Sequence, residues 1–311
     1  MSSPAHTVAT NRGELVLGGA SDARPLLMGI VNATPDSFSD GDLPQTVEAR
    51  VDLARSLLAD GADLIDIGGE SGVTNRPPVS AEEEVARVVP VIEAVAQGLG
   101  ARVSVDTYKP AVARAAIAAG ASIVNDVSGL RDIELADVCA ETGAALVVMH
   151  TIAPPKTKHH DPSLDHRIVG EVERFLAERI ELATSRGVAF EQLIVDPGPD
   201  FSKTPAQTIA VLRALPALHG LGRPILLAVS RKDFVGALTQ RPPRARLGGT
   251  LAAVAHGVAA GAHILRVHDV ADSADFLTVS AALGSNGEID PGLRVPDTLR
   301  WDQAVSDRAA R

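Results

Sequence analysis

Eight short runs of apolar residues recur along the chain, with little alternation between apolar and polar positions. Such runs are typical of strands that are buried on both faces of a parallel sheet. Ala-rich stretches with helical spacing separate them, the clearest at 47–62 and 81–100. Strand followed by helix, eight times over, predicts an α/β fold with parallel pairing, the (β/α)₈ TIM barrel. The apolar runs cover residues 26–32, 63–68, 102–107, 122–128, 145–150, 193–198, 225–230 and 264–269.

The same pattern sets the predicted boundaries. A single barrel spans residues 26–283, and residues 1–25 and 284–311 show weak periodicity, so they are interpreted as N-terminal and C-terminal tails. A doubly wound open sheet is the alternative fold, but no Gly-x-Gly-x-x-Gly follows the first apolar run. Ser80 stands three residues before Glu83, which predicts a capping box at the start of one helix.

The amino-acid composition indicates which kinds of binding partner and which cellular compartment to expect. The 311 residues carry a net charge of −10 and contain six Phe, one Tyr and one Trp, a balance that disfavours nucleic acid as a partner. The longest uncharged stretch, 247–265, is mostly Gly and Ala, so no membrane span is predicted. The N-terminal residues lack the apolar core of a secretion signal, and we therefore expect a cytoplasmic protein. The single cysteine, Cys139, is interpreted as a helix-buried thiol.

Polar groups stand where the predicted strands end. The active site of a TIM barrel is built at the C-terminal ends of its strands. Asp106 and Asp196 are acceptors for a donor-rich ligand edge, and Asn125 can both donate and accept. Arg266 and His268 lie two apart on one strand, face the same side and predict a compact anion site. The residues at the eight ends are Asn32, Glu70 with Ser71, Asp106, Asn125 with Asp126, Met149 with His150, Asp196, Ser230 to Lys232, and Arg266 to Asp269.

Seven motifs resemble those of the dihydropteroate synthase family and follow the family's order, over about residues 26–283. They are Asn32-Ala-Thr-Pro-Asp-Ser-Phe-Ser-Asp-Gly, Asp66-Ile-Gly-Gly-Glu-Ser, Ser104-Val-Asp-Thr, Asn125-Asp-Val-Ser-Gly, Asp196-Pro-Gly, Ser230-Arg-Lys and Arg266-Val-His-Asp. The resemblance implies a barrel of the pterin-binding type, a homodimer and a transferase of folate biosynthesis. That family joins p-aminobenzoate to 6-hydroxymethyl-7,8-dihydropterin diphosphate and releases diphosphate.

The resemblance also implies residue roles. Asn32 would carry a Mg²⁺ bound to the diphosphate, while Arg266 and His268 would grip this leaving group. Asp106 would stabilise the positive charge left on the pterin, and with Lys232 it carries the catalytic role. No protein nucleophile is then required. The residues implied to hold the pterin are Asp106, Asn125, Met149, Asp196 and Lys232, and those implied around p-aminobenzoate are Thr74, Arg76, Phe201 and Lys232.

Three departures from the family pattern lie on the p-aminobenzoate side. Residues are inserted in the second loop, so that Thr74 and Arg76 are no longer adjacent. Asp200 and Ser202 replace two glycines, which commonly permit a positive φ or a close backbone approach. Asp233 replaces a serine; it either neutralises Lys232 or caps the next helix. The pattern resembles the second, divergent synthase paralogues of high-GC bacteria, some of which are expected to lack the activity.

Three readings therefore stay open. The first is a synthase that makes dihydropteroate, and the second is a paralogue that binds pterin or an anion with little or no turnover. The third is a pterin-binding methyltransferase, which the motifs at Asn32 and Ser230 disfavour. Two further signals are weak: the segment Gly198–Thr204 imitates a P-loop without the Gly before Lys203, and four histidines in 150–166 could indicate zinc.

Overall fold

Each of the eight apolar runs forms a strand of one parallel sheet in the computed structural model, which describes residues 6–18, 24–34, 46–72, 77–157, 159–284 and 289–300. The order of the strands along the sheet is β8-β7-β6-β5-β4-β3-β10-β9. A parallel bridge between Val195 and Ile225 joins the two ends of this order and closes the barrel. The strands are β3 (Leu26–Asn32), β4 (Leu64–Gly68), β5 (Val103–Asp106), β6 (Ile123–Asp126), β7 (Ala145–Met149), β8 (Leu193–Asp196), β9 (Leu226–Leu227) and β10 (Ile264–Val267).

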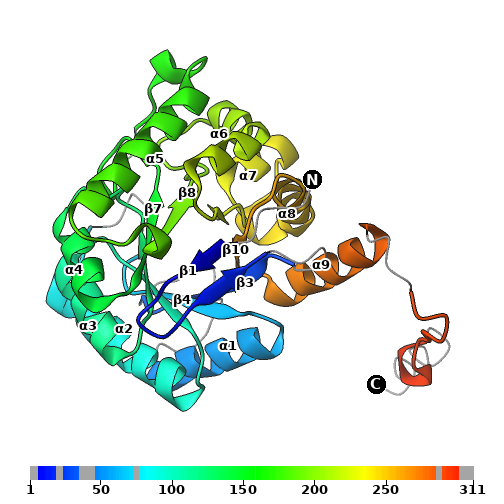
Figure 1. The fold of residues 1–311 in the computed structure, drawn as a ribbon. Helices are drawn as coiled ribbons and strands as arrows, with labels where there is room; N and C mark the ends of the chain where they lie inside the picture. The colour runs from blue at the N-terminus through cyan, green and yellow to red at the C-terminus, as the bar shows by residue number, and fades with distance from the viewer. Residues whose placement is uncertain are drawn as a thin grey trace.

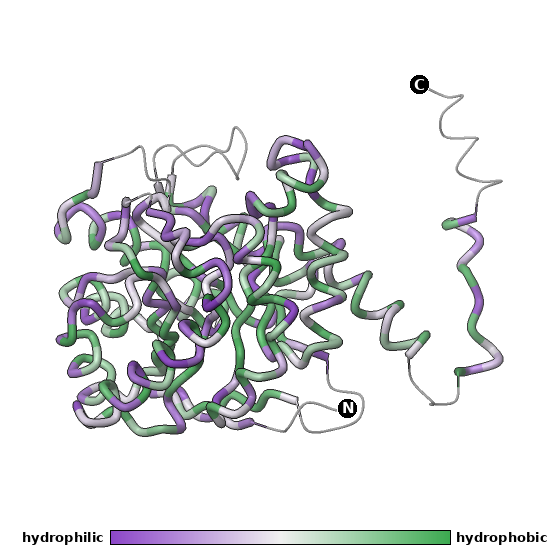
Figure 2. The backbone as a smooth tube through the Cα atoms, turned by 90° about the horizontal axis from the view of Figure 1, so that it is seen from above, coloured by the Kyte–Doolittle hydropathy of each residue, from purple (hydrophilic) through white to green (hydrophobic). Residues whose placement is uncertain are grey.

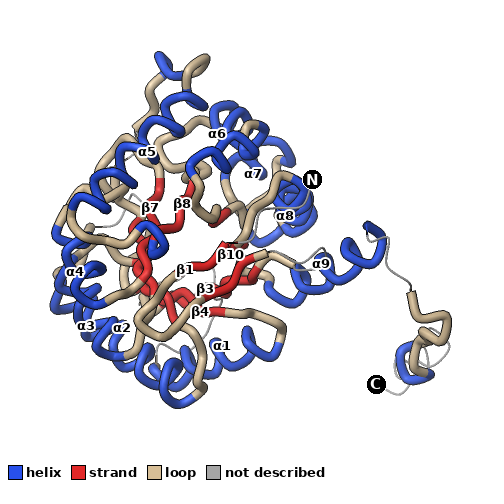
Figure 3. Tube along the Cα trace, viewed as in Figure 1, coloured by secondary structure: helices blue, strands red, loops and turns tan. Residues whose placement is uncertain are grey.

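Helices surround the strands on the outside, as Figures 1 and 3 show, so the TIM-barrel prediction is confirmed. The α-helices are α1 (Val47–Ala59), α2 (Ala81–Glu93), α3 (Pro110–Ala119), α4 (Glu134–Thr142), α5 (Ile168–Ser185), α6 (Pro205–Arg213), α7 (Asp233–Thr239), α8 (Leu247–Ala259) and α9 (Val270–Gly284). A π-helical turn (Ala94–Gly98) and 3₁₀ turns (Pro162–Leu164, Phe190–Gln192, Leu215–Leu221, Pro243–Ala245 and Asp297–Leu299) complete them.

Local signals explain several of these boundaries. Ser80 Oγ accepts from the amide of Glu83 at 3.2 Å, which is one half of the predicted capping box, whereas the Glu83 carboxylate pairs with Arg87. Cys139 is fully buried on α4, and burial raises the pKa of its thiol to about 12, as expected for a structural cysteine. Apolar stretches run through the middle of the barrel in Figure 2, while residues 289–300 lie away from it and are exposed. Within the described residues, no helix combines the length and the apolar character needed to cross a bilayer.

The N-terminal segment corrects the sequence analysis, which treated residues 1–25 as a tail. Strands β1 (His6–Val8) and β2 (Leu15–Leu17) form an antiparallel hairpin. Val8, Leu15 and Leu17 are buried against apolar side chains inside the barrel, including those at the starts of β4, β6, β7 and β10. The hairpin therefore closes the N-terminal end of the barrel. Two three-residue strands are too short to produce a visible periodicity.

We expect Leu17→Ala to lower the free energy of unfolding by about 2–5 kcal/mol, because it leaves a cavity at the base of the barrel. The side chain of Leu17 is 1% exposed, whereas that of its neighbour Val16 is 64% exposed. Val16→Ala is thus the matched control, with an expected change within about 0.5 kcal/mol. Urea denaturation of both variants measures the difference. Equal losses of unfolding free energy in the two variants would contradict the conclusion that the hairpin packs into and closes the N-terminal end of the barrel.

Candidate active site

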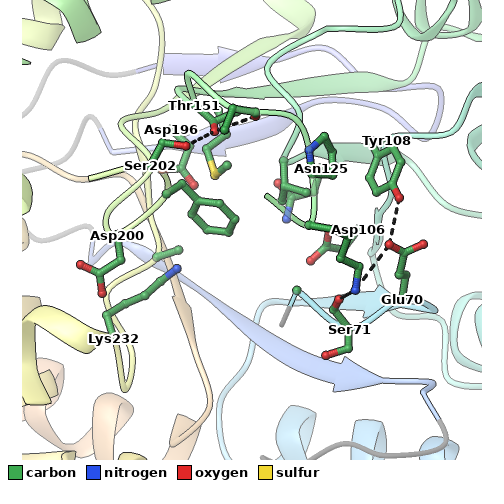
Figure 4. Close-up of a pocket in the computed structure, with 18 of the residues that line it drawn as sticks. Glu70, Ser71, Asp106, Tyr108, Asn125, Thr151, Asp196, Asp200, Ser202 and Lys232 are labelled. Atoms are coloured by element: carbon green, nitrogen blue, oxygen red, sulfur yellow. Dashed lines mark hydrogen bonds and ion pairs between the residues drawn. The ribbon is translucent and has the colours of Figure 1, made fainter. Parts of the chain in front are cut away.

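A cavity of about 730 Å³ opens at the C-terminal ends of the strands. The predicted site residues converge on it from different strands, and Figure 4 shows Lys232 reaching in from one side while Asp106 and Asn125 lie opposite. Thr74 and Arg76 lie outside the described residues. The predicted residues that line this cavity are Asn32, Asp106, Asn125, Met149, Asp196, Phe201, Lys232, Arg266 and His268.

Arg266 forms hydrogen bonds with two carboxylates at the floor of the cavity. Its Nε donates to Asp66 Oδ2 at 2.6 Å and its Nη2 to Asp106 Oδ2 at 2.8 Å. Asn125 Nδ2 donates to the same Asp66 oxygen at 3.2 Å. We call these four residues the Arg266 network. Burial and, to a smaller extent, the charge of Asp66 raise the pKa of Asp106 to about 7, against the effect of Arg266.

Asp196 and Lys232 form the other polar wall. Asp196 is 3% exposed, and its Oδ1 accepts from the amide of Gly198 at 2.7 Å. Burial raises the pKa of this carboxyl and lowers the pKa of Lys232. Lys232 Nζ lies 4.3 Å from the centroid of the Phe201 ring, a cation–π contact. An acceptor, a cation and an aromatic face thus stand together at the cavity wall.

The imidazole of His268 is neutral, so the predicted anion site carries one positive charge, on Arg266, rather than two. Burial, with Arg266 and Arg231 nearby, lowers the pKa of His268 to about 3. The His268 amide donates to Ser230 Oγ at 3.2 Å, and its Nδ1 lies 2.9 Å from the same oxygen. The neutral ring either accepts the Ser230 hydroxyl proton at Nδ1 and presents Nε2–H to a ligand, or donates from Nδ1 and presents Nε2 as an acceptor. Within the predicted pair of Arg266 and His268, only Arg266 carries a formal charge. Its guanidinium already donates to the carboxylates of Asp66 and Asp106.

The segment after Asp196 keeps a left-handed backbone at the two positions where glycine was expected. The φ angles are +65° at Asp200 and +51° at Ser202. Left-handed conformations cost L-residues about 1–2 kcal/mol each, and local hydrogen bonds oppose this strain here. Asp200 accepts from Thr208 Oγ1 at 3.0 Å and from the Phe234 amide at 3.2 Å, near the N-terminus of α7. The Asp200 carboxylate is therefore engaged by α6 and α7.

The third departure, Asp233, lies at the exposed rim of the cavity. It is the first residue of α7, its side chain is 87% exposed, and it forms an ion pair with Arg246 at 3.0 Å. Neither expectation for it is met: the N-cap position belongs to Lys232, and the carboxylate pairs with a different cation. The Arg246 guanidinium thus offsets the charge of the Asp233 carboxylate at the rim of the cavity.

The buried side chain of Lys203 stabilises the loop that follows Asp196. Its Nζ lies 2.8 Å from Gly198 O, 3.2 Å from Phe201 O and 2.7 Å from His150 Nδ1. Burial lowers the pKa of Lys203 to about 7, while three acceptors around Nζ favour the ammonium form. This lysine serves the fold of the loop, so the P-loop interpretation is wrong. Nor do three metal-ligating side chains gather anywhere in the described part of the chain.

A cluster of charged and polar side chains, which the sequence analysis did not predict, links three loops through hydrogen bonds and ion pairs. Lys109 Nζ lies 2.6 Å from Glu70 Oε2 and 2.5 Å from Glu84 Oε2. Tyr108 donates to Glu70 Oε1 at 2.9 Å (Figure 4). Lys156 Nζ lies 3.5 Å from the same oxygen. Lys156 also donates to the backbone oxygen of Ser71. Glu70 is part of a recognised motif, but its partners from the loops after β5 and β7 carried no signal in the sequence.

Comparisons with known proteins identify one family. The family model described as "Pterin binding enzyme" matches residues 28–268. The dihydropteroate synthase of Bacillus subtilis is 40% identical over 270 residues, 86% of this chain and 92% of that protein. The synthase of Escherichia coli K12 is 39% identical over 260 residues, 84% of this chain and 92% of that protein.

Solved structures agree as well. The Xanthomonas albilineans dihydropteroate synthase with 4-aminobenzoic acid matches with a TM-score of 0.81 at 43% identity, over 90% of this chain and 100% of that one. A structure of that enzyme with 7,8-dihydropteroate matches with a TM-score of 0.76 at 45% identity, over 86% of this chain and 97% of that one. The chain therefore belongs to the dihydropteroate synthase family of pterin-binding enzymes.

Proposed function

We propose that this protein condenses 6-hydroxymethyl-7,8-dihydropterin diphosphate with p-aminobenzoate and releases diphosphate. The convergence of Asp106, Asn125, Asp196 and Lys232 on one cavity carries this proposal. Two carboxylates and an amide suit the donor-rich edge of a pterin, and Met149 offers an apolar surface to its ring. The relatives above support it, since one is a synthase that carries 4-aminobenzoic acid and another carries 7,8-dihydropteroate.

The residues support a dissociative route. Breaking the C–O bond leaves positive charge on the pterin methylene, which the carboxylate of Asp106 stabilises, and negative charge on the departing diphosphate. Arg266 and the Nε2–H of His268 donate to the diphosphate oxygens. The amine of p-aminobenzoate then forms the new C–N bond and loses a proton to solvent. Phe201 and Lys232 border the p-aminobenzoate molecule, with the Lys232 ammonium available to its carboxylate.

The end of β3 suits a divalent cation that also binds the diphosphate. Asn32 is half-buried at this end and lines the cavity, and its side chain offers the amide oxygen that a hard cation prefers. Diphosphate and water oxygens would supply the remaining ligands of a Mg²⁺. When bound, Mg²⁺ neutralises charge on the leaving group.

We further propose that the protein is a cytoplasmic homodimer. Gly248, Ala252 and Ala259 are exposed along one side of α8, and small residues at helical spacing permit close packing between helices. The departures at Asp200, Ser202 and Asp233 still fit the divergent second paralogue of high-GC bacteria. Because the left-handed backbone is kept and the Asp233 carboxylate is paired with Arg246, they support retained activity over the inactive alternative.

Calorimetry followed by a product assay tests the function. Titration with the pterin diphosphate and Mg²⁺ is expected to release heat, and added p-aminobenzoate is expected to yield dihydropteroate and diphosphate in equal amounts. Binding without product would favour the non-catalytic paralogue. An absence of heat would contradict the proposed substrate.

A further inference from the structure

We propose that Asp66 is a positioning residue of the pterin pocket, which fixes the rotation of the Asn125 amide and of the Arg266 guanidinium. The inference rests on the proposed function for its ligand, a pterin. Asp66 lies in the middle of β4 and is fully buried beneath the cavity floor. It does not itself line the cavity, so it acts through the two side chains that do.

The hydrogen bonds of one Asp66 oxygen carry the argument. Asp66 Oδ2 accepts from Asn125 Nδ2 at 3.2 Å and from Arg266 Nε at 2.6 Å. A carboxylate paired with a guanidinium only accepts hydrogen bonds, so the NH₂ end of the Asn125 amide must face it. The oxygen of Asn125 is then left as an acceptor for an N–H group of the ligand. Without Asp66, the amide could present either end.

The second oxygen indicates that packing of the core alone does not account for a carboxylate at position 66. Asp66 Oδ1 is buried and has no hydrogen-bond partner among the described residues, and the same holds for Oγ of Ser104. Ser104 is the register partner of Asp66 on the neighbouring strand β5. A half-satisfied buried carboxylate costs free energy, and a well-packed apolar side chain would serve the core at least as well. Holding Asn125 and Arg266 in place is what the carboxylate adds.

Pterin affinity of three single variants tests the inference, measured by calorimetry with 6-hydroxymethylpterin. Asp66→Ala removes the acceptor and is expected to weaken binding by about tenfold or more. Asp66→Asn can keep an oxygen toward Asn125 and Arg266 while its NH₂ faces Ser104, so most of the affinity should return. Ser104→Ala, at the same level of the barrel, is the matched control and should stay within about twofold of the wild type.

A ligand-free measurement separates this inference from the proposed function. The side-chain amide signal of Asn125 in NMR spectra, assigned with Asn125→Asp, should report a hydrogen-bonded NH₂ in the wild type and in Asp66→Asn. In Asp66→Ala it should shift and exchange faster with water. If the wild type binds no pterin, the proposed function fails and this signal alone decides the role of Asp66. An unchanged signal, or unchanged affinity in folded Asp66→Ala, would overturn the inference.

Discussion

Asp196→Ala is expected to weaken pterin binding by at least about a hundredfold, to below what calorimetry detects. Asp196 ends β8 at the cavity wall, and with 3% exposure it has almost no contact with water. A buried acceptor that receives ligand N–H groups cannot be replaced by solvent, so its loss leaves those donors unpaired. Few single changes in the cavity remove as much ligand recognition.

Two variants separate recognition of the ligand from the local fold. Asp196→Asn keeps an oxygen for the Gly198 amide, which now lies 2.7 Å from Asp196 Oδ1, but replaces the other acceptor with a donor. It should therefore bind pterin almost as poorly as Asp196→Ala while retaining the wild-type melting temperature more closely. Asp233→Ala, at the rim with its side chain facing solvent, should bind normally. Retained affinity in Asp196→Ala would place the pterin pocket elsewhere.

The fold could be predicted because each barrel strand is a short apolar run that needs no partner to be recognised. The strand ends then placed the polar side chains at one end of the barrel. The hairpin formed by β1 and β2 escaped this reasoning, since its buried Val8, Leu15 and Leu17 gain meaning only against the barrel interior. Local pattern reveals an element when the element is long enough to show its period.

The partners within the site could not be predicted, because they are set by tertiary contacts. Arg266 meets Asp66 and Asp106, which lie 200 and 160 positions away in the chain. The neutral state of His268 depends on burial and on neighbouring cations, and neither is visible in the motif. Likewise, Asp200 in place of glycine gave no sign that Thr208 and the start of α7 would engage its carboxylate. Motifs identify residue types, whereas protonation and orientation come from packing.

Removal of Arg266 should have the largest effect on stability, and the effect should depend on pH. Asp66 is fully buried, and Arg266 is the cation that contacts both its carboxylate and that of Asp106. Taking one partner from a buried ion pair typically costs about 3–5 kcal/mol, because the remaining charge stays desolvated. Arg266→Met leaves two carboxylates in contact with the same apolar side chain, so we expect a loss of this size in urea denaturation at pH 8.5.

The loss should shrink as the pH falls. The pKa of Asp106 is already raised to about 7 in the folded protein, and without the guanidinium it rises further. A carboxyl whose folded pKa lies above its unfolded value favours the folded state at low pH, and this advantage disappears as the pH rises through the folded pKa. At pH 6, Asp106 in Arg266→Met is therefore protonated and relieves its repulsion with Asp66. Arg24→Met, which breaks a half-exposed pair with Asp63, should cost below about 1 kcal/mol at both pH values. An equal loss at pH 6 and pH 8.5 in Arg266→Met would show that Asp66 and Asp106 do not repel each other.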